Sequence, residues 1–395
     1  MTLRVAFVVP DLQRPSGWRS FSVGAIRSLQ EYAGIHPVVF TSREDAISAR
    51  RLLPACDLVI VPRTQFMGLR NPLTWPEMAL TFWHIKNRQF PQVDLVHSLE
   101  AYPTGLVGSW LAWKLGKCHL ITACGTYGVV WHNSVFDKLL YKQVLRRAWG
   151  MCPISHGTAS LVQRYFGKAL ANVRVQPILP GNDYYKTVSR SESFHRQFSV
   201  TPTIISVGAV KLRKGYHISL AAFAKVKEQL PSARYFIVGS FDQNSYYYDQ
   251  LRQFIAEHQL RDVEFLGIVS EEKLQQYYRQ ASVFLLTPQQ QGLYFEGFGL
   301  VYLEAGAYGL PVVGTRTGGV PDAVKDGVTG FLAEPHDVDC IANALLRLLT
   351  DVDLARRMGQ ANREWAETLT WERFAAEQYA VYQKALAQSN NAGVA

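Results

Sequence analysis

The stretch Glu296-Gly-Phe-Gly-Leu-Val-Tyr-Leu-Glu304 places two carboxylates eight positions apart, with glycines just after the first. Gly309-Leu-Pro-Val-Val-Gly-Thr315 and Thr317-Gly-Gly-Val-Pro321 follow it. Gly297 and Gly299 leave room for a ligand to approach the backbone, and a helix starting near Gly297 would offer free N–H groups to an anion. Such a helix would separate the Cα atoms of the two glutamates by about 12 Å. The pattern therefore predicts a phosphate site and a long ligand with an anionic middle.

This stretch resembles the Glu-x7-Glu signature of family 4 of the retaining glycosyltransferases, whose members share the two-domain GT-B fold. The resemblance implies that Glu296 holds the donor sugar and that Glu304 holds the nucleotide ribose. It also assigns to the donor site the residues between them, Gly297, Phe298, Gly299 and Leu300. The alternative is a surface helix with two exposed glutamates, and the Gly-Leu-Pro and Gly-Gly elements count against it.

A second motif, Ser206-Val-Gly-Ala-Val-Lys-Leu-Arg-Lys-Gly215, lies between a predicted strand and a predicted helix. Ligands bind at this edge of a doubly wound sheet, and clustered Lys and Arg side chains suit a diphosphate. The motif resembles the Gly-Arg…Lys-Gly element of the same family, whose cations neutralise the leaving nucleotide diphosphate. In this match Gly208 and Lys214 align directly, and Arg213 is adjacent. Ala209 stands where the family has Arg, so Lys211 or Arg213 is expected to supply the missing charge.

The resemblance implies further contacts outside these two motifs. Backbone at Gly267 and Ile268 would flank the nucleotide base. In the N-terminal half, Gly17 takes the position of the family's glycine loop, although a plain strand-to-helix turn explains it nearly as well. Cys124 stands where the family has His, and it is expected on the acceptor side together with His97. His97 ends a predicted strand that would face the cleft, and a buried structural histidine is the competing interpretation.

The candidate catalytic residues are therefore Lys214, Arg213, Glu296 and His97. No protein nucleophile is required, because the resemblance implies that the leaving diphosphate helps to deprotonate the acceptor hydroxyl. A pair of hydrolase carboxylates is disfavoured by their predicted separation, since such pairs lie about 5–9.5 Å apart.

Alternation of β-rich and helical segments predicts an α/β fold. Strands are expected at residues 4–10, 37–40, 58–61, 94–98, 119–123, 152–155 and 173–177, and then at 204–207, 235–238, 263–266 and 283–286. The predicted architecture is GT-B, with two Rossmann-like doubly wound domains facing a central cleft. The domains are residues 1–187 for the acceptor and 200–369 for the nucleotide sugar. A helix over 370–387 is expected to cross back to the N-terminal domain.

Composition narrows the class of protein. The chain has 395 residues, more than one hydrophobic core usually supports. Its five cysteines are odd in number and lack Cys-x2-Cys spacing, which disfavours a disulfide or zinc framework. The N-terminus reads as a strand, not as a signal peptide, and no segment has the composition of a membrane span. A cytoplasmic protein is expected.

The net charge of +9 is unevenly distributed. Residues 1–200 hold 23 Lys and Arg against 11 Asp and Glu, and residues 201–395 hold 18 against 21. The basic half suits an anionic partner, such as a phosphorylated acceptor or the inner face of a membrane. Lys138, Lys142 and Arg146 form a stripe on a predicted helix that could contact such a surface, and nucleic acid is not a predicted partner. A basic surface that only aids solubility is an equally good explanation.

Asp337-Val-Asp339 and Asp351-Val-Asp353 resemble the Asp-x-Asp of metal-dependent transferases, but each precedes a helical pattern where Asp is a favoured N-cap. Neither a metal nor a cofactor is predicted. The sequence thus predicts a metal-independent, retaining hexosyltransferase that uses a UDP- or GDP-sugar and an unidentified hydroxyl acceptor: a glycan, a lipid-linked molecule or a small molecule. Two alternatives stay open: a catalytically weak relative that serves as a nucleotide-sugar sensor or scaffold, and a phosphorolytic or hydrolytic carbohydrate enzyme on a related fold.

Overall fold

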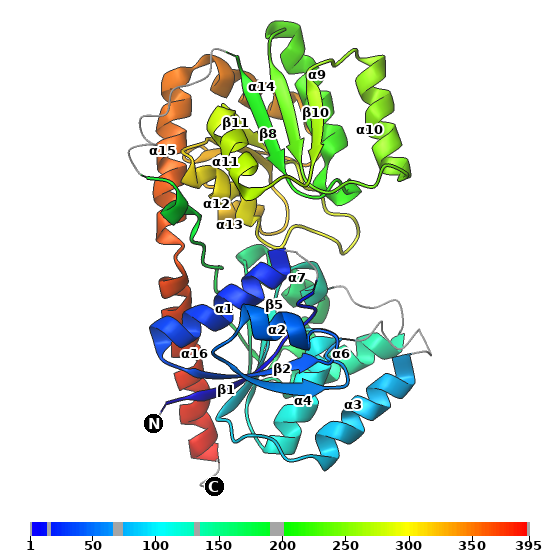
Figure 1. The fold of residues 1–395 in the computed structure, drawn as a ribbon, viewed down its shortest axis with the longest axis vertical. Coiled ribbons are helices and arrows are strands. Elements are labelled where there is room, and N and C mark those ends of the chain that lie inside the picture. The colour runs from blue at the N-terminus through cyan, green and yellow to red at the C-terminus, as the bar shows by residue number, and fades with distance from the viewer. Residues whose placement is uncertain (1, 14–16, 66–73, 130–134, 190–200, 393–395) are drawn as a thin grey trace. The chain divides into compact units, whose positions relative to one another are not determined.

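The computed structural model describes residues 2–13, 17–65, 74–129, 135–189 and 201–392. The chain divides into two compact units, each with its own sheet (Figure 1). The first unit comprises Met1–Gly181 and Leu369–Ala395, and the second comprises Asn182–Thr368. Tyr184–Thr187, placed by the sequence analysis in the N-terminal domain, belongs to the second unit as the 3₁₀ helix η3. The guanidinium of Arg363 fixes it there, donating to the carbonyl of Tyr185 at 2.6 Å.

The first unit contains a seven-stranded parallel sheet in the order β3-β2-β1-β4-β5-β6-β7. Its strands are β1 (Arg4–Val8), β2 (His36–Ser42), β3 (Asp57–Val61), β4 (Leu95–Ser98), β5 (His119–Ala123), β6 (Gly150–Pro153) and β7 (Arg174–Val175). The inner strands are almost continuously apolar and buried, as expected for a parallel sheet covered on both faces.

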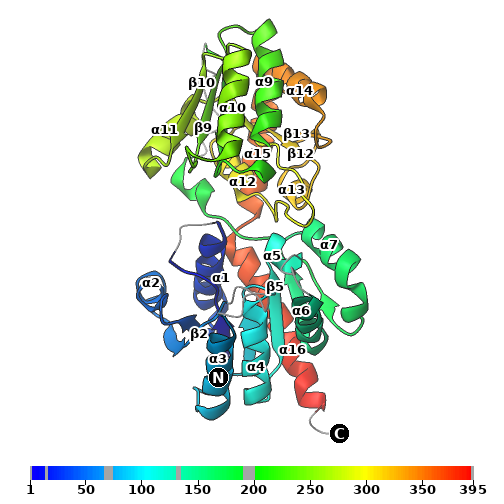
Figure 2. The same ribbon diagram turned by 90° about the vertical axis from the view of Figure 1, so that its right-hand side faces the viewer.

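Helices cover both faces of this sheet (Figure 2). They are α1 (Gly17–Ala33), α2 (Ala46–Leu52), α3 (Trp75–Asn87), α4 (Thr104–Leu115), α5 (Thr126–Val129), α6 (Val135–Arg147), α7 (His156–Phe166) and α16 (Trp371–Ala392). The C-terminal helix α16 packs along α1, where the ring of Trp371 fills the space above Gly24. Phe21 of α1 contacts both Trp371 and Phe374. The last helix therefore completes the core of the first unit.

The second unit has a six-stranded parallel sheet in the order β10-β9-β8-β11-β12-β13. The strands are β8 (Thr203–Val207), β9 (Arg234–Val238), β10 (Val263–Gly267), β11 (Val283–Leu285), β12 (Val312–Thr315) and β13 (Gly330–Ala333). Its helices are η4 (Leu212–Lys214), α9 (Tyr216–Gln229), α10 (Tyr246–Glu257), α11 (Glu271–Gln280), α12 (Leu300–Ala307), α13 (Val320–Ala323), α14 (Val338–Thr350) and α15 (Val352–Thr368).

The predicted α/β class and the predicted strands are confirmed, with ends that differ by a few residues. The capping interpretation of the two Asp-x-Asp pairs is also confirmed. Asp337 accepts a hydrogen bond from the N–H of Cys340, and Asp351 accepts one from the N–H of Leu354, both at 2.9 Å. None of the helices that the structure describes combines the length and apolar composition that a membrane span requires.

Candidate functional site

At the carboxyl edge of the second sheet, glycines leave the backbone uncovered by side chains. Three neighbouring strands, β8, β9 and β10, end at or just before Gly208, Gly239 and Gly267. Gly208 donates its N–H to Val238 at 2.8 Å, and Gly239 donates to Gly267 at 2.9 Å. Gly239 has a φ of +144°, and a Cβ there would collide with the carbonyl of Gly208. Only glycine permits this close crossing, which leaves backbone accessible at the edge where ligands bind in doubly wound sheets.

Next to this edge, two cations converge on one carboxylate. Lys214 donates from Nζ to Oε2 of Glu296 at 2.6 Å, and Arg213 donates from Nη1 to the same oxygen at 3.0 Å. The cations come from η4 and Glu296 from the loop before α12, so residues more than 80 positions apart meet here. Lys214 is 9% exposed. A charge network of this density, close to free backbone, suits a phosphorylated ligand.

The pKa of Glu296 reflects two opposing effects. Burial raises the pKa, because a charged carboxylate loses its hydration. The charges of Lys214 and Arg213 and their hydrogen bonds lower it, and they prevail, so that the pKa lies below its ordinary value. Glu296 is therefore ionised at neutral pH even though its side chain is only 14% exposed.

The predicted start of the helix is wrong. The helix α12 begins at Leu300, not near Gly297, and Gly299 precedes it with a φ of +100°. Glu296 therefore lies in a loop, where its carbonyl accepts a hydrogen bond from Gly319 at 2.8 Å. The helical estimate of about 12 Å between the glutamates does not apply, because eight helical rises no longer separate them. The Gly-Gly pair predicted to belong to the motif packs against it.

Glu304 lies within α12, and among the described residues its side-chain hydrogen-bond partners are two tyrosines. The hydroxyl of Tyr278 in α11 donates to its Oε2 at 3.0 Å, and the hydroxyl of Tyr184 in η3 also donates to the carboxylate. Burial raises the pKa of Glu304 to about 7, and the two tyrosine hydrogen bonds oppose that rise. Glu304 therefore titrates near neutral pH, unlike Glu296.

Sequence reasoning missed Tyr184 and Tyr278. Neither lies in a recognisable motif, and each reaches Glu304 from a distant segment of the second unit. The run of tyrosines at 277–278 was the available signal, but its pattern alone is that of an amphipathic helix.

The other predicted donor residues occupy distinct positions in the second unit. Arg213 joins the cation cluster, whereas Lys211 is exposed, so Arg213 is the better placed to replace the missing family arginine at Ala209. Ile268 follows β10 with its side chain 84% exposed. Phe298 is buried, and Gly297 and Leu300 are partly exposed beside Glu296.

In the first unit, the three predicted residues lie in different environments. His97 is completely buried in β4, with its ring nitrogens bonded to the hydroxyls of Tyr382 at 2.6 Å and Thr122 at 2.9 Å. Burial, together with the charge of His119, lowers the pKa of His97 to about 3. This arrangement favours the structural interpretation of His97, because its side chain points at α16 and not at the carboxyl edge.

Cys124 follows β5 at the carboxyl edge, partly exposed, with its thiol directed at the carbonyl of Leu99 at 3.4 Å. Gly17 is the first residue of α1, and the two residues before it, Pro15 and Ser16, lie outside the described residues.

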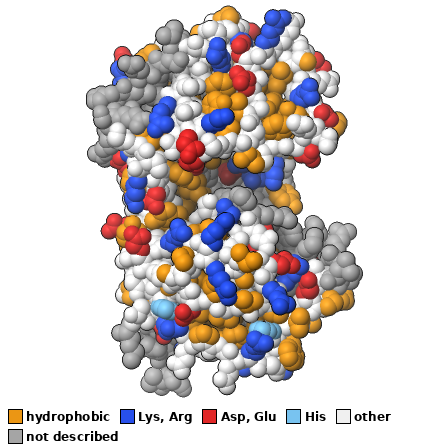
Figure 3. All heavy atoms as spheres, viewed as in Figure 1, with side chains coloured by type: hydrophobic (Ala, Val, Ile, Leu, Met, Phe, Trp, Pro, Cys, Tyr) orange, Lys and Arg blue, Asp and Glu red, His pale blue; other side chains and the backbone are white. Residues whose placement is uncertain are grey.

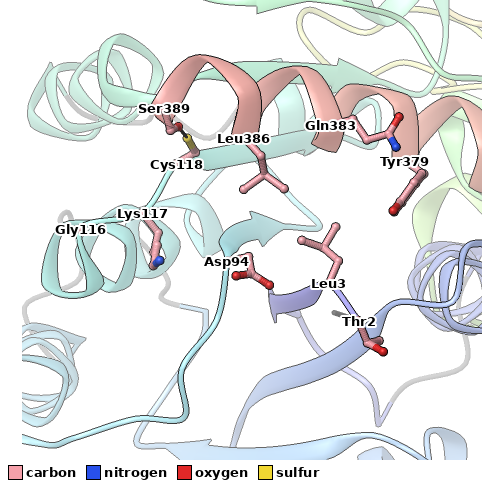
Figure 4. Close-up of a pocket in the computed structure, with 10 residues that line it drawn as sticks. All are labelled: Thr2, Leu3, Asp94, Gly116, Lys117, Cys118, Tyr379, Gln383, Leu386 and Ser389. Atoms are coloured by element: carbon pink, nitrogen blue, oxygen red, sulfur yellow. Dashed lines mark hydrogen bonds between the residues drawn. The ribbon is translucent and has the colours of Figure 1, made fainter. Parts of the chain in front are cut away.

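A cavity of about 470 Å³ opens elsewhere in the first unit, at the amino edge of its sheet (Figure 4). It is bounded by the start of β1, the turn between α4 and β5, and the outer part of α16, with Asp94, Lys117 and Gln383 in its wall. The carboxylate of Asp94 accepts a hydrogen bond from the N–H of Arg4 at 2.7 Å. This cavity lies at the end of the strands opposite to Cys124, so it is separate from the predicted acceptor residues.

No cluster of three or more His, Cys, Asp or Glu side chains suited to a metal ion occurs within residues 2–13, 17–65, 74–129, 135–189 and 201–392. The acids of the two Asp-x-Asp pairs instead bond helix N-termini or pair with Lys225 and Arg356.

Comparison with known proteins identifies the family. Residues 190–365 match the model of glycosyl transferases group 1, and residues 23–181 match that of glycosyltransferase family 4. The chain is 32% identical to D-inositol 3-phosphate glycosyltransferase of Corynebacterium efficiens over 325 residues, covering 77% of this chain and 74% of the relative. The chain belongs to family 4 of the glycosyltransferases. The predicted resemblance is thereby confirmed, and the protein is a retaining glycosyltransferase that uses a nucleotide-sugar donor.

A further relative of the family 4 chain is the GDP-mannose-dependent alpha-(1-6)-phosphatidylinositol monomannoside mannosyltransferase of Mycolicibacterium smegmatis. It is 28% identical over 283 residues, covering 69% of this chain and 72% of the relative. Among solved structures, Anabaena HepE in complex with UDP and glucose superposes with a TM-score of 0.72 at 18% identity, covering 97% of this chain and 100% of that one. Sucrose-phosphate synthase from Thermosynechococcus elongatus gives 0.73 at 22% identity, covering 98% and 100%. These structures confirm the GT-B fold.

Proposed function

We propose that this glycosyltransferase moves a hexose from a UDP- or GDP-sugar to a hydroxyl acceptor, without a metal ion, and that Lys214, Arg213 and Glu296 form the centre of its donor site. The observation that carries the proposal is the convergence of two cations on Glu296, next to the bare backbone at Gly208. Lys214 also lies close to Gly208, since its Cε is 3.7 Å from where a Cβ of that glycine would stand.

In the proposed mechanism, the donor diphosphate binds Lys214 and Arg213. It replaces some of the hydrogen bonds that these two side chains make with Glu296. The glycosidic bond forms between the acceptor oxygen and the anomeric carbon, while the bond from that carbon to the phosphate oxygen breaks. The acceptor proton passes to the leaving diphosphate on the same face of the sugar. Fixed cations stabilise the charge that develops on the diphosphate, which lowers the barrier because they need no reorganisation.

The two glutamates take different parts of the donor in this proposal. Glu296, released from part of its ion pairs, accepts hydrogen bonds from the sugar hydroxyls. Glu304 accepts hydrogen bonds from the ribose, and its two tyrosine partners set the direction of its carboxylate. Backbone around Ile268 flanks the base.

The acceptor is proposed to be a phosphorylated or otherwise anionic hydroxyl compound. Relatives are named for D-inositol 3-phosphate and for a phosphatidylinositol mannoside, both of which contain phosphate. The surplus of Lys and Arg in residues 1–200 suits such an acceptor. Cys124 and Gly17 stay as proposed contacts on the acceptor side, whereas His97 is proposed to support the fold.

The test is a panel of UDP-, GDP- and ADP-sugars, each measured for binding by calorimetry and for transfer or slow hydrolysis by chromatography. The proposal expects one UDP- or GDP-sugar to bind and to turn over, with the anomeric configuration retained in the product by NMR. Turnover is expected to survive EDTA, since Lys214 and Arg213 provide the charge that a divalent ion would supply.

Binding without turnover against any acceptor would favour the sensor or scaffold alternative, and an absolute requirement for Mg²⁺ or Mn²⁺ would contradict the metal-independent mechanism.

A further inference from the structure

One face of the first unit carries exposed apolar side chains that the donor site does not use. The order of the strands reverses between β3 and β4, and right-handed crossovers therefore place α3, α4 and α6 on the sheet face opposite to α1 and α2. On this layer, seven large apolar side chains are more than half exposed: Trp75, Leu80, Trp83, Trp113, Val135, Phe136 and Leu139. On the opposite face, the described large apolar side chains that are exposed are Tyr32 of α1, at 41%, and Ile47 of α2, at 83%. The exposed apolar side chains are thus concentrated on the layer of α3, α4 and α6.

The helix α3 is apolar on both of its sides. Ile85 is 1% exposed, and Met78 packs against the same core cluster, so one side of α3 covers the sheet. The other side presents Leu80 at 52% and Trp83 at 61% exposure. An exposed apolar patch on the outer side of a helix that already covers a sheet indicates a contact surface.

Aromatic packing continues the patch from α3 to α4. Phe82 of α3 contacts the ring of Trp110 edge-on at 5.1 Å and stacks on Trp113 at 6.4 Å. Trp113 nevertheless remains 60% exposed. The ring of Phe82 packs against one side of the Trp113 indole, so the exposed indole has a defined position on the surface.

Charge on this layer is strongly positive. The helices α3, α4 and α6 contain six Lys and Arg and two Asp and Glu, of which Asp137 is buried and Glu77 pairs with Arg63. The ammonium of Lys114 donates to the carbonyl of Lys86 at 2.8 Å, which brings the two exposed lysines together beside the aromatic patch. On the face drawn in Figure 3, basic and apolar side chains likewise lie interspersed over the surface of the first unit.

We propose that the outer face of α3, α4 and α6 is an interfacial surface that docks on an anionic lipid bilayer, with Trp83, Trp113 and Phe136 inserted at the level of the headgroups. Indole rings favour this layer, because one side of the ring is apolar and the N–H remains hydrated. Lys86 and Lys114 reach the lipid phosphates while their methylene stems cover the apolar patch. A protein partner would need carboxylates facing these lysines, whereas an anionic bilayer supplies negative charge everywhere on the plane.

This inference goes beyond the electrostatic docking predicted for the stripe on α6. It adds an apolar anchor on α3 and α4, which salt does not screen. It is independent of the proposed function, because vesicle binding needs neither donor nor acceptor.

The test is sedimentation of the full chain with vesicles of phosphatidylcholine, with and without phosphatidylserine, at low and high salt. The wild type is expected to bind the anionic vesicles, and high salt is expected to weaken this binding without abolishing it, because the Debye length falls to about 3 Å at 1 M. Trp83→Ser with Trp113→Ser is expected to reduce the partition coefficient by about 10-fold or more. The reason is that the variant lacks the two indole rings whose apolar area would be removed from water on insertion into the bilayer. Lys86→Gln with Lys114→Gln is expected to reduce binding at low salt only.

The matched control is Ile47→Ser, an 83% exposed position on α2, on the opposite face of the sheet, which should leave binding unchanged. Trp83→Ser alone, at an exposed site, tests the proposal if the double variant loses its fold by circular dichroism. Absence of wild-type binding to anionic vesicles would overturn the proposal, as would equal binding of the tryptophan variants. A salt-stable dimer that Trp83→Ser dissociates, without any vesicle binding, would overturn it in favour of a protein interface.

Discussion

Two buried carboxyl groups, Glu296 in the second unit and Glu100 in the first, are held in different charge states. In the second unit, Glu296 is held ionised by Lys214 and Arg213, which lower its pKa. In the first unit, burial raises the pKa of Glu100 to about 8, although the N–H of Ala101 donates to it at 2.9 Å. His97, which lies in β4 three residues before Glu100, is held neutral by burial, which lowers its pKa. Burial alone therefore does not set the charge state of these carboxyl groups, because nearby cations keep Glu296 ionised.

This contrast supports the proposal that the donor diphosphate binds in the second unit. A site that neutralises a leaving diphosphate needs fixed positive charge before the substrate arrives. The second unit has it in Lys214 and Arg213, whereas burial disfavours the charged forms of His97 in β4 and of Glu100 just after it in the first unit. Four experiments could break or sharpen this division.

The largest effect is expected from Lys214→Ala. Loss of this ammonium should lower kcat/KM by about 100-fold or more, as loss of a charge-stabilising donor typically does. Steady-state kinetics with the best donor of the panel would measure it, with circular dichroism to confirm the fold. Lys211→Ala is the matched control, because it removes an exposed lysine of the same loop and should have little effect. Near-normal turnover of Lys214→Ala would remove the central residue of the proposed site.

The two glutamates should be separable by the ligands they affect. Glu304→Ala should weaken both the nucleotide sugar and the free nucleoside diphosphate by about 10-fold or more, because a hydrogen bond to a charged group contributes about 1.5–3 kcal/mol. Glu296→Ala should weaken the nucleotide sugar and spare the free diphosphate. Calorimetry with both ligands measures this difference. Equal losses for the two ligands in both variants would show that the sugar and ribose roles are wrongly divided.

Donor affinity should depend on pH through Glu304. Its pKa of about 7 means that the carboxylate is protonated below neutral pH and then accepts ribose hydrogen bonds less well. Affinity should fall as pH drops through 7, by at most about 10-fold per pH unit. Tyr278→Phe removes a hydroxyl that lowers the pKa, so its midpoint should move to higher pH.

Calorimetric titrations with UDP or GDP across neutral pH measure the midpoint. Glu304→Gln is the reference that reports titration of the nucleotide itself, and Tyr246→Phe, at an exposed position, is the control. An unchanged midpoint in Tyr278→Phe would show that this hydroxyl does not act on the binding carboxylate.

The smallest effect on catalysis is expected from His97→Asn. The change should lower the free energy of unfolding by about 1–3 kcal/mol, because the hydroxyls of Tyr382 and Thr122 lose a buried partner. It should leave kcat/KM of the folded protein unchanged. Thermal or denaturant unfolding measures the change in stability, and steady-state kinetics on the same preparation measure kcat/KM. The control is His258→Asn, at an exposed position. A large loss of kcat/KM at unchanged stability would show that His97 acts in catalysis and not only in the fold.

The sequence predicted the α/β class, the strands of the first sheet, β8 to β11 of the second sheet and the family, and it did so from local patterns. Apolar β-branched runs mark buried strands, and Asp before an apolar helical pattern marks an N-cap, as Asp337 and Asp351 show. The Glu-x7-Glu and Lys-Gly elements were also visible, because each motif is contiguous in the chain. Such features depend on neighbours within a few residues, which a sequence displays directly.

Tertiary structure decided everything that depends on distant neighbours. It moved the start of α12 to Leu300, because Gly299 adopts a left-handed conformation. It brought Tyr278 and Tyr184 to Glu304, and it buried His97 against α16. It also left one side of α3 exposed, although its composition resembles that of a buried helix. Burial and charge state are sums over all surrounding atoms, and those atoms come from segments whose proximity no local pattern encodes.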